Sequence, residues 1–206
     1  MHKIRGGNAG LAETAPISLL VCFSGKIGSG KTSTSRAVAS ALRCGRASFG
    51  DYLRDVVATR GGDPGCRKSL QDLGQARIDQ DAELFCSEVL TAGGFVPGED
   101  FVLDGIRHVE VLPHLVSISA PSEVRLIFLK ADAGLRSIRV ADRAAWVPED
   151  FDAAADHLVE SDMEAELPMA ADAIVDSSIP ERDVIKHCIR FIDAWRSGGS
   201  CVKSGL

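Results

Sequence analysis

A glycine-rich stretch, residues 25–32, restricts the fold of this chain more than any other feature. Its sequence is Gly-Lys-Ile-Gly-Ser-Gly-Lys-Thr, a G-x-x-x-x-G-K-T pattern. The apolar run at residues 17–23 is too short for a helix and predicts a buried strand, and the pattern of residues 32–42 predicts a helix. In such a strand–turn–helix unit the backbone N–H groups curl inward and, with the helix N-terminus, bind a polyphosphate. The sequence therefore predicts an α/β fold built around a phosphate-binding loop.

Two side chains of this loop have the chemistry to hold a nucleoside triphosphate and its metal ion. Lys31 would reach the β- and γ-phosphates of ATP as a point charge, and the Thr32 hydroxyl would ligate the bridging Mg²⁺. The other positions expected to contact ATP are Gly25, Gly28, Ser29, Gly30 and Ser33. A dinucleotide-binding G-x-G-x-x-G pattern starting at Gly28 would need glycine at position 33 and does not use the Lys-Thr pair. The predicted cofactors are ATP and Mg²⁺.

Length and charge bound the number of domains and the kind of partner. A chain of 206 residues with 45% apolar residues suits a single α/β domain with a full core. We expect this domain to span residues 17–196, because residues 1–16 and 197–206 lack periodicity and are expected to be poorly ordered. The net charge of −6 argues against non-specific binding of nucleic acid, although it allows a local cationic cleft.

The cysteines and the first apolar run indicate a compartment. Six cysteines, at positions 22, 44, 66, 86, 188 and 201, form no C-x-x-C pair, so we expect reduced thiols rather than a zinc site. Residues 17–23 are too few to span a bilayer, and no small-residue cleavage site follows them. The sequence therefore predicts a cytoplasmic protein without a membrane partner, either a monomer or a homodimer.

The segment after the first helix places two charged residues where a substrate could bind. Residues 47–49 predict a short strand and residues 52–59 a helix, with Asp51 and Arg54 at its start. Two simpler roles are open: Asp51 as the helix N-cap and Arg54 as a solvated surface charge.

A turn cluster at residues 61–65 then leads into the longest predicted helix, residues 67–90. Its polar face repeats every four residues, with Arg67, Gln71 and Gln75. These side chains could contact a base or a phosphate, or they could simply face solvent.

A second buried strand, predicted over residues 101–107, has an acid near its carboxyl end. Ligands of open parallel sheets bind beyond the carboxyl ends of the strands, so Asp104 would lie beside the phosphate-binding loop and could hold a Mg²⁺-bound water. Arg107 would point into the same crevice. The alternative is a turn carboxylate paired with its neighbouring arginine.

Three arginines share one side of a later helix. Residues 124–129 predict a strand, and in the helix after it Arg136, Arg139 and Arg143 fall within one narrow arc. Like charges at that spacing repel unless an anion covers them, although nearby aspartates could offset part of the repulsion. A strand at residues 171–176 and a helix at 182–195 follow. We therefore predict a five-stranded, mainly parallel sheet with the phosphate-loop strand in its centre and helices on both faces.

Together these motifs resemble the P-loop nucleotide kinases, the adenylate-kinase-like and dephospho-coenzyme-A-kinase-like group, over about residues 19–178. Residues 49–54, Phe-Gly-Asp-Tyr-Leu-Arg, are similar to the segment that opens the acceptor arm of adenylate kinases, which implies that Arg54 grips an acceptor phosphate. Residues 104–107, Asp-Gly-Ile-Arg, resemble Asp-Gly-Phe-Pro-Arg without its proline, which implies a magnesium role for Asp104 and an acceptor role for Arg107. The resemblance also implies an acceptor arm at about residues 50–94 and a short lid at about 132–148.

The remaining motifs fit the same family. Arg136, Arg139 and Arg143 look like its lid arginines, which neutralise the transferring phosphoryl group. Residues 171–178 are similar to the Ala-Asp-x-x-Ile-x-Asn element near its C-terminus, with serine where asparagine is usual. The activity implied is transfer of the ATP γ-phosphate to a small molecule.

The acceptor is the least determined part of this expectation. An acceptor that carries a phosphate needs arginines in the site. The arginines of this chain favour such an acceptor, a nucleoside monophosphate, with Gln71 and Gln75 near its base. A hydroxyl acceptor, such as that of a dephospho-coenzyme-A kinase, needs a base, for which Asp51 is the candidate. An ATPase or GTPase switch and a non-catalytic nucleotide-binding protein remain as alternatives of other classes.

Overall fold

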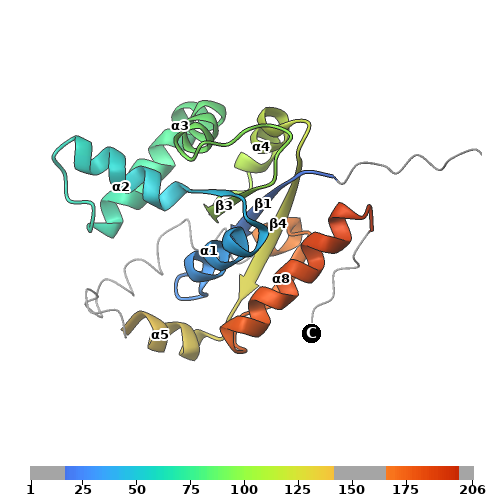
Figure 1. Ribbon diagram of the computed structural model, residues 1–206. Helices are drawn as coiled ribbons and strands as arrows, with labels where there is room; N and C mark the ends of the chain where they lie inside the picture. Colours follow the sequence, from blue (N-terminus) through green and yellow to red (C-terminus); the bar gives the residue numbers. More distant parts are fainter. Residues whose placement is uncertain (1–16, 142–165, 200–206) are drawn as a thin grey trace, which may run out of the picture.

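The computed structural model describes residues 17–141 and 166–199, and within them a five-stranded sheet forms the centre of the fold (Figure 1). The strand order is β2-β3-β1-β4-β5, and every neighbouring pair is parallel. The strands are β1 (Leu19–Ser24), β2 (Gly45–Ser48), β3 (Phe101–Ile106), β4 (Glu123–Lys130) and β5 (Ala173–Asp176). The predicted α/β architecture, with the phosphate-loop strand central, is confirmed.

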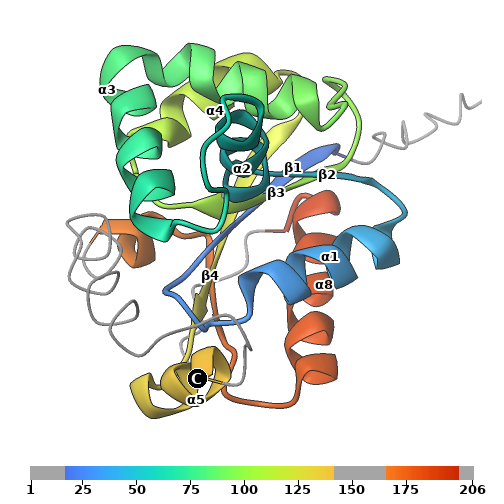
Figure 2. The ribbon, with the colours of Figure 1, turned by 90° about the vertical axis from the view of Figure 1, so that its left-hand side faces the viewer.

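Helices cover both faces of the sheet, as Figure 2 shows. They are α1 (Lys31–Leu42), α2 (Phe49–Thr59), α3 (Arg67–Ala92), α4 (Val111–Ser119), α5 (Ala133–Ala141) and α8 (Glu181–Arg196). Residues 166–170 add a short helix before β5. Parallel strands need crossover connections, and helices supply them here, so the strand carboxyl ends share one edge of the sheet.

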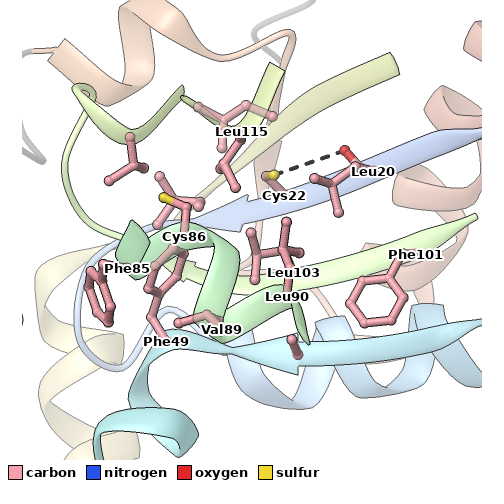
Figure 3. Close-up of a cluster of buried hydrophobic side chains, with 14 of the residues drawn as sticks. Leu20, Cys22, Phe49, Phe85, Cys86, Val89, Leu90, Phe101, Leu103 and Leu115 are labelled. Carbon is pink, nitrogen blue, oxygen red and sulfur yellow. Dashed lines mark hydrogen bonds between the residues drawn. The ribbon is translucent and has the colours of Figure 1, made fainter. Parts of the chain in front are cut away.

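The side chains of β1 divide between two cores because successive residues of a strand face opposite sides. Leu20 and Cys22 join the core under α2, α3 and α4, where Phe85 and Leu115 pack (Figure 3). The alternate residues of β1 join a second core with α1 and α8, whose members include Leu19, Val21, Phe23, Val38, Ile192 and Trp195. All six residues of β1 are buried, as expected for a central strand of a parallel sheet.

Two helices were missed by the sequence reasoning, namely α4 and the short helix at residues 166–170, and another helix departs from its predicted form. We did not predict α4, which contains Pro113 in an apolar segment; proline is tolerated there because it lies in the first turn. Helix α3 runs two residues further than predicted and is interrupted at Asp81, whose φ and ψ of −166° and 92° are not helical. The Asp81 carboxylate accepts the Leu84 N–H at 2.9 Å and so caps the second part of the helix.

Two boundaries near the second strand also differ from the prediction. The strand covers Gly45–Ser48 and α2 begins at Phe49, three residues earlier than expected. The N-cap of α2 is Ser48, whose hydroxyl accepts the Asp51 N–H at 3.3 Å, so the suggestion that Asp51 is the cap was wrong. The Asp51 side chain is therefore available for ion pairs.

The cysteines of the described residues are free thiols, as predicted. Burial raises the pKa of Cys86 and of Cys188 to about 12, and it raises that of Cys22 further still, so these thiols stay protonated. In residues 17–141 and 166–199 no group of three or more His, Cys, Asp and Glu could hold a metal. Within the same ranges no helix is both long and apolar enough to cross a membrane. Cys201 lies outside the described residues.

Candidate active site

The glycines of the phosphate-binding loop allow the turn to pack tightly against its neighbours. Gly25 and Gly28 have φ of 142° and 79°, values that residues with a side chain rarely adopt. A Cβ atom on Gly25 would lie 2.4 Å from the Leu129 carbonyl oxygen, and one on Gly28 would lie 2.6 Å from that of Arg136. The loop is therefore pressed against the end of β4 and against α5.

Lys31 is the first residue of α1, and its side chain folds back over the loop. Its ammonium group donates to the carbonyl oxygens of Gly25 and, at 2.9 Å, Lys26. Gly30, which precedes the helix, has no side chain to cap the first N–H groups. The beginning of α1 therefore combines backbone N–H groups that precede the first intrahelical bonds with a cation, which is the arrangement that binds phosphate.

A cavity of about 500 Å³ opens beside Lys31 and runs between the loop, the end of β3 and the α2–α3 arm. Two surfaces of different chemistry line it. The polar one includes Lys31, Thr32, Arg36, Arg54, Arg67, Gln71, Asp104, Arg107 and His108. The apolar one includes Ile27, Phe49, Leu53, Leu70, Ile78, Phe85 and Val111.

The polar surface is strongly cationic. One lysine and four arginines line the cavity, whereas Asp104 is the only carboxylate among its described lining residues. The whole chain has a net charge of −6, so these cations are concentrated locally. Arg36 lies on the exposed side of α1 and was not singled out from the sequence. Its spacing of five residues from Lys31 could have placed it just beyond the first turn of the same helix.

Asp104 and Thr32 fit a magnesium site. The Asp104 side chain is 3% exposed, and its Oδ1 atom has no hydrogen-bond partner among the described residues. Thr32 lines the same cavity, next to the position expected for the phosphates. An acid that holds a metal-bound water and one hydroxyl ligand are typical of Mg²⁺, which keeps most of its water and phosphate ligands.

Arg46 holds this acid, and sequence reasoning missed it. It donates to Asp104 Oδ2 at 2.6 Å, to Asp51 Oδ2 at 3.3 Å and to the Ser35 hydroxyl at 3.0 Å. The arginine side chain is only 14% exposed. It is an arginine in a four-residue strand, so the sequence offers no periodicity that marks it.

Asp51 and Arg54 form an ion pair, and Asp51 also pairs with Arg46. Partial burial alone would raise the pKa of Asp51, but the hydrogen bonds and charges of Arg54 and Arg46 outweigh it and lower that pKa below its usual value. Arg54 lines the cavity, whereas Asp51 is not among the lining residues within the described part of the chain. The carboxylate therefore orients an arginine of the cavity wall.

The two predicted glutamines have different surroundings. Gln71 is nine-tenths buried and lines the cavity, and its Nε2 atom has no partner among the described residues. Gln75 instead donates to Asp79 at 2.8 Å and does not belong to the described cavity lining. The four-residue spacing therefore brings only Arg67 and Gln71 to the site.

The arginines of α5 lie against the other side of the phosphate-binding loop. Arg136 donates to the Ile27 carbonyl at 3.3 Å, and Arg139 donates to the Ser177 carbonyl at 2.8 Å. Arg139 also borders a second cavity of about 270 Å³, which includes Ser29, Ser33 and Glu181 in its wall. Arg143 lies outside the described residues.

Comparison with known proteins identifies the family. The AAA domain family matches residues 21–160, about two thirds of the chain. The chain belongs to the AAA domain family. A "UPF0200 protein" from Aeropyrum pernix is 32% identical over 103 residues, which cover 47% of this AAA domain protein and 50% of that relative. The chain thus spans half the length of this curated relative.

Solved structures share the fold of this AAA domain protein. A gluconokinase from Sinorhizobium meliloti 1021 has a TM-score of 0.59 at 17% identity, covering 89% of this chain and 95% of its own. Shikimate kinase from Aquifex aeolicus has a TM-score of 0.55 at 14% identity, covering 88% of this chain and 100% of its own. At these identities the likeness establishes the fold, and the resemblance to P-loop kinases predicted from the sequence is confirmed at that level.

Proposed function

We propose that this protein transfers the γ-phosphoryl group of ATP to a small anionic acceptor, most specifically a nucleoside monophosphate. The observation that carries the proposal is the single cavity that joins Lys31 to Arg36, Arg54 and Arg107. A protein that binds ATP without an acceptor would not need a cavity that extends from Lys31 to these arginines. The kinase names of the solved neighbours support the same class of reaction.

The loop and α5 would bind the donor. The N–H groups at the start of α1 and the Lys31 ammonium would hold the β- and γ-phosphates, once Lys31 releases the loop carbonyls that it now contacts. Thr32 and Asp104 would hold Mg²⁺, which when bound supplies charge neutralisation between these phosphates. Arg136 and Arg139 lie on the opposite side of the loop, where they would stabilise negative charge on the nucleotide.

The arm and the end of β3 would bind the acceptor. Phosphoryl transfer has a loose transition state, so the site needs aligned cations more than a strong base. Arg54 and Arg107 can each bind a phosphate through two N–H groups, and this overcomes repulsion between the two anionic substrates. The apolar wall that includes Phe49 and Phe85 would take the base, and the Gln71 amide would donate to an acceptor atom on it.

A second candidate is a kinase with a hydroxyl acceptor. The uncommitted Oδ1 of Asp104 supports it, because a carboxylate at the cavity could accept the hydroxyl proton. Asp51 is less suited to that role, since two arginines hold it and lower its pKa. Two solved neighbours, a sugar kinase and shikimate kinase, have names that specify acceptors other than nucleotides.

An acceptor screen tests the proposal and separates the candidates. We expect ADP release from ATP to depend on a nucleoside monophosphate, and Arg54→Ala to raise the KM for that acceptor with a smaller effect on the KM for ATP. Transfer only to hydroxyl compounds would favour the second candidate. ADP release that no acceptor stimulates would instead indicate an ATPase and refute the kinase.

A further inference from the structure

We propose that Arg46 is a positioning residue: it holds the Asp104 carboxylate, and through Asp51 the Arg54 guanidinium, in the geometry used for phosphoryl transfer. Its kinetic consequences rest on the proposed function. Arg46 does not belong to the cavity lining within residues 17–141 and 166–199, so it would act through the residues that it holds.

A single guanidinium joins three elements of the site. Its Nε donates to Ser35 on α1, its Nη1 to Asp51 on α2 and its Nη2 to Asp104 on β3. The planar fork thus ties the phosphate-loop helix, the acceptor arm and the strand with the predicted magnesium acid to one rigid group. A lysine could supply the charge but not the three directed bonds.

Asp104 depends on this contact for its orientation. Of its two carboxylate oxygens, Oδ2 accepts from Arg46, and Oδ1 has no partner among the described residues. Anchoring Oδ2 therefore fixes the direction of Oδ1, the atom left for a metal-bound water or a hydroxyl. Partners that orient a functional group in this way typically contribute about 10–100-fold to affinity or activity.

The same guanidinium affects the acceptor side through Asp51. One oxygen of Asp51 pairs with Arg46 and the other with Arg54, which lines the cavity. Without Arg46, Asp51 would keep its ion pair with Arg54, whose side chain is 47% exposed, but would lose its ion pair with β2. The acceptor arginine would then lose its link to the sheet, so the KM for the acceptor should rise.

A purely structural role makes a different prediction. The contact between Arg46 and Asp104 is a buried ion pair, and breaking such a pair destabilises a protein whether or not it serves catalysis. The control must therefore be another arginine that holds two carboxylates. Arg125 meets this requirement: it pairs with Glu123 and Asp172 and is not a lining residue of the described cavities.

The experiment compares Arg46→Gln, Arg46→Lys and Arg125→Gln, each checked by thermal unfolding. We expect Arg46→Gln to lower kcat by about 10–100-fold, while the KM for ATP stays within about threefold of wild type. Arg46→Lys should recover part of kcat, and it replaces the glutamine variant if that one does not fold. Arg125→Gln should leave kcat unchanged. A matching loss of kcat in Arg125→Gln would assign the effect to stability and overturn the proposal.

A double-substitution cycle with Asp104→Asn tests whether Arg46 acts through Asp104. In that background Arg46→Gln should change kcat by less than about threefold, because the group it positions is already lost. The same four proteins are compared by the increase in ADP affinity that Mg²⁺ causes. Arg46→Gln should reduce this increase only when Asp104 is present. That binding measurement needs no acceptor. If the wild type has no transferase activity, the proposed function is refuted, and the binding measurement still tests the role of Arg46. Equal effects in both backgrounds, or none in either, would overturn the proposal.

Discussion

Gly28→Ala should disrupt the phosphate-binding loop far more than the same change at a glycine of similar φ elsewhere. The φ of Gly28 is 79° and that of Gly61 is 74°, so both substitutions place alanine in the left-handed region. That conformation costs about 1–2 kcal/mol, offset by about 0.4–1 kcal/mol from the reduced freedom of the unfolded chain. At Gly61 nothing in the described structure lies within 4 Å of the added Cβ, so a net cost of about 1 kcal/mol is expected there.

The position of Gly28 adds a steric term. Its Cβ would lie 2.6 Å from the Arg136 carbonyl oxygen and 3.0 Å from the Arg136 Cα, and both atoms belong to the backbone of α5. Overpacking of this kind typically costs about 1–3 kcal/mol, so the total for Gly28→Ala is about 2–4 kcal/mol. If the loop moves to relieve the contact, the steric term of about 1–3 kcal/mol appears as lost affinity. Because about 1.4 kcal/mol corresponds to a tenfold change, ADP should then bind about 5–150-fold more weakly.

The assay is urea unfolding and ADP titration calorimetry on both variants. Gly61→Ala should lose about 1 kcal/mol of unfolding free energy and keep the wild-type affinity for ADP. Gly28→Ala should lose stability, affinity or both, in an amount that exceeds the Gly61 value by the steric term. Equal behaviour of the two variants would refute the reasoning, because it would mean that α5 does not press on the loop.

Three further predictions concern catalysis, motion and pH. Lys31→Ala should lower kcat more than about 100-fold while thermal unfolding shows an intact fold, because the proposed role of Lys31 is to hold the ATP phosphates; near-native turnover would exclude a catalytic loop. Amide exchange in the predicted arm, residues 50–94, and in the predicted lid, residues 132–148, of which 142–148 lie outside the described residues, should slow only when ATP and acceptor are both present. Exchange that substrates leave unchanged would contradict closure. The lowered pKa of Asp51 means that its ion pairs stabilise the fold above its unfolded pKa of about 3.9 and are lost as pH falls through the lower folded pKa. The stability difference between wild type and Asp51→Asn should therefore shrink below about pH 4, and a constant difference would argue against these pairs.

The local elements of the fold could be predicted because each has its own sequence signal. The all-apolar β1 and the glycine-rich turn determine the strand, the loop and the beginning of α1 without information from elsewhere. Asp104 could be predicted because it follows a buried run at the carboxyl end of a strand. The interruption of α3 at Asp81 could not be predicted, because Asp81 lies within a part of the helical pattern, residues 75–92, that no glycine or proline breaks.

The role of Arg46 needed a second kind of information, the order of the strands. Residues two apart in a strand face the same side, so Arg46 shares a side with Ser48, and Val102 shares a side with Asp104. The register pairs Arg46 with Val102 and Ser48 with Asp104. Once β2 is known to lie beside β3, a long side chain at position 46 can reach position 104 diagonally. The sequence alone gave no such adjacency, since the two residues are 58 positions apart.

The cationic cavity links the fold to its ligand through stability as well as chemistry. Lys31 and four arginines converge on a space with one described carboxylate, and like charges brought together oppose folding. These cations therefore lower the stability of the free protein, and an anionic ligand offsets that loss when it binds. Any ligand that binds only the folded state raises the unfolding free energy, by about 2.7 kcal/mol at a hundredfold excess over Kd. Bound polyphosphate would therefore stabilise the loop and the arm most, because these elements contribute the converging cations.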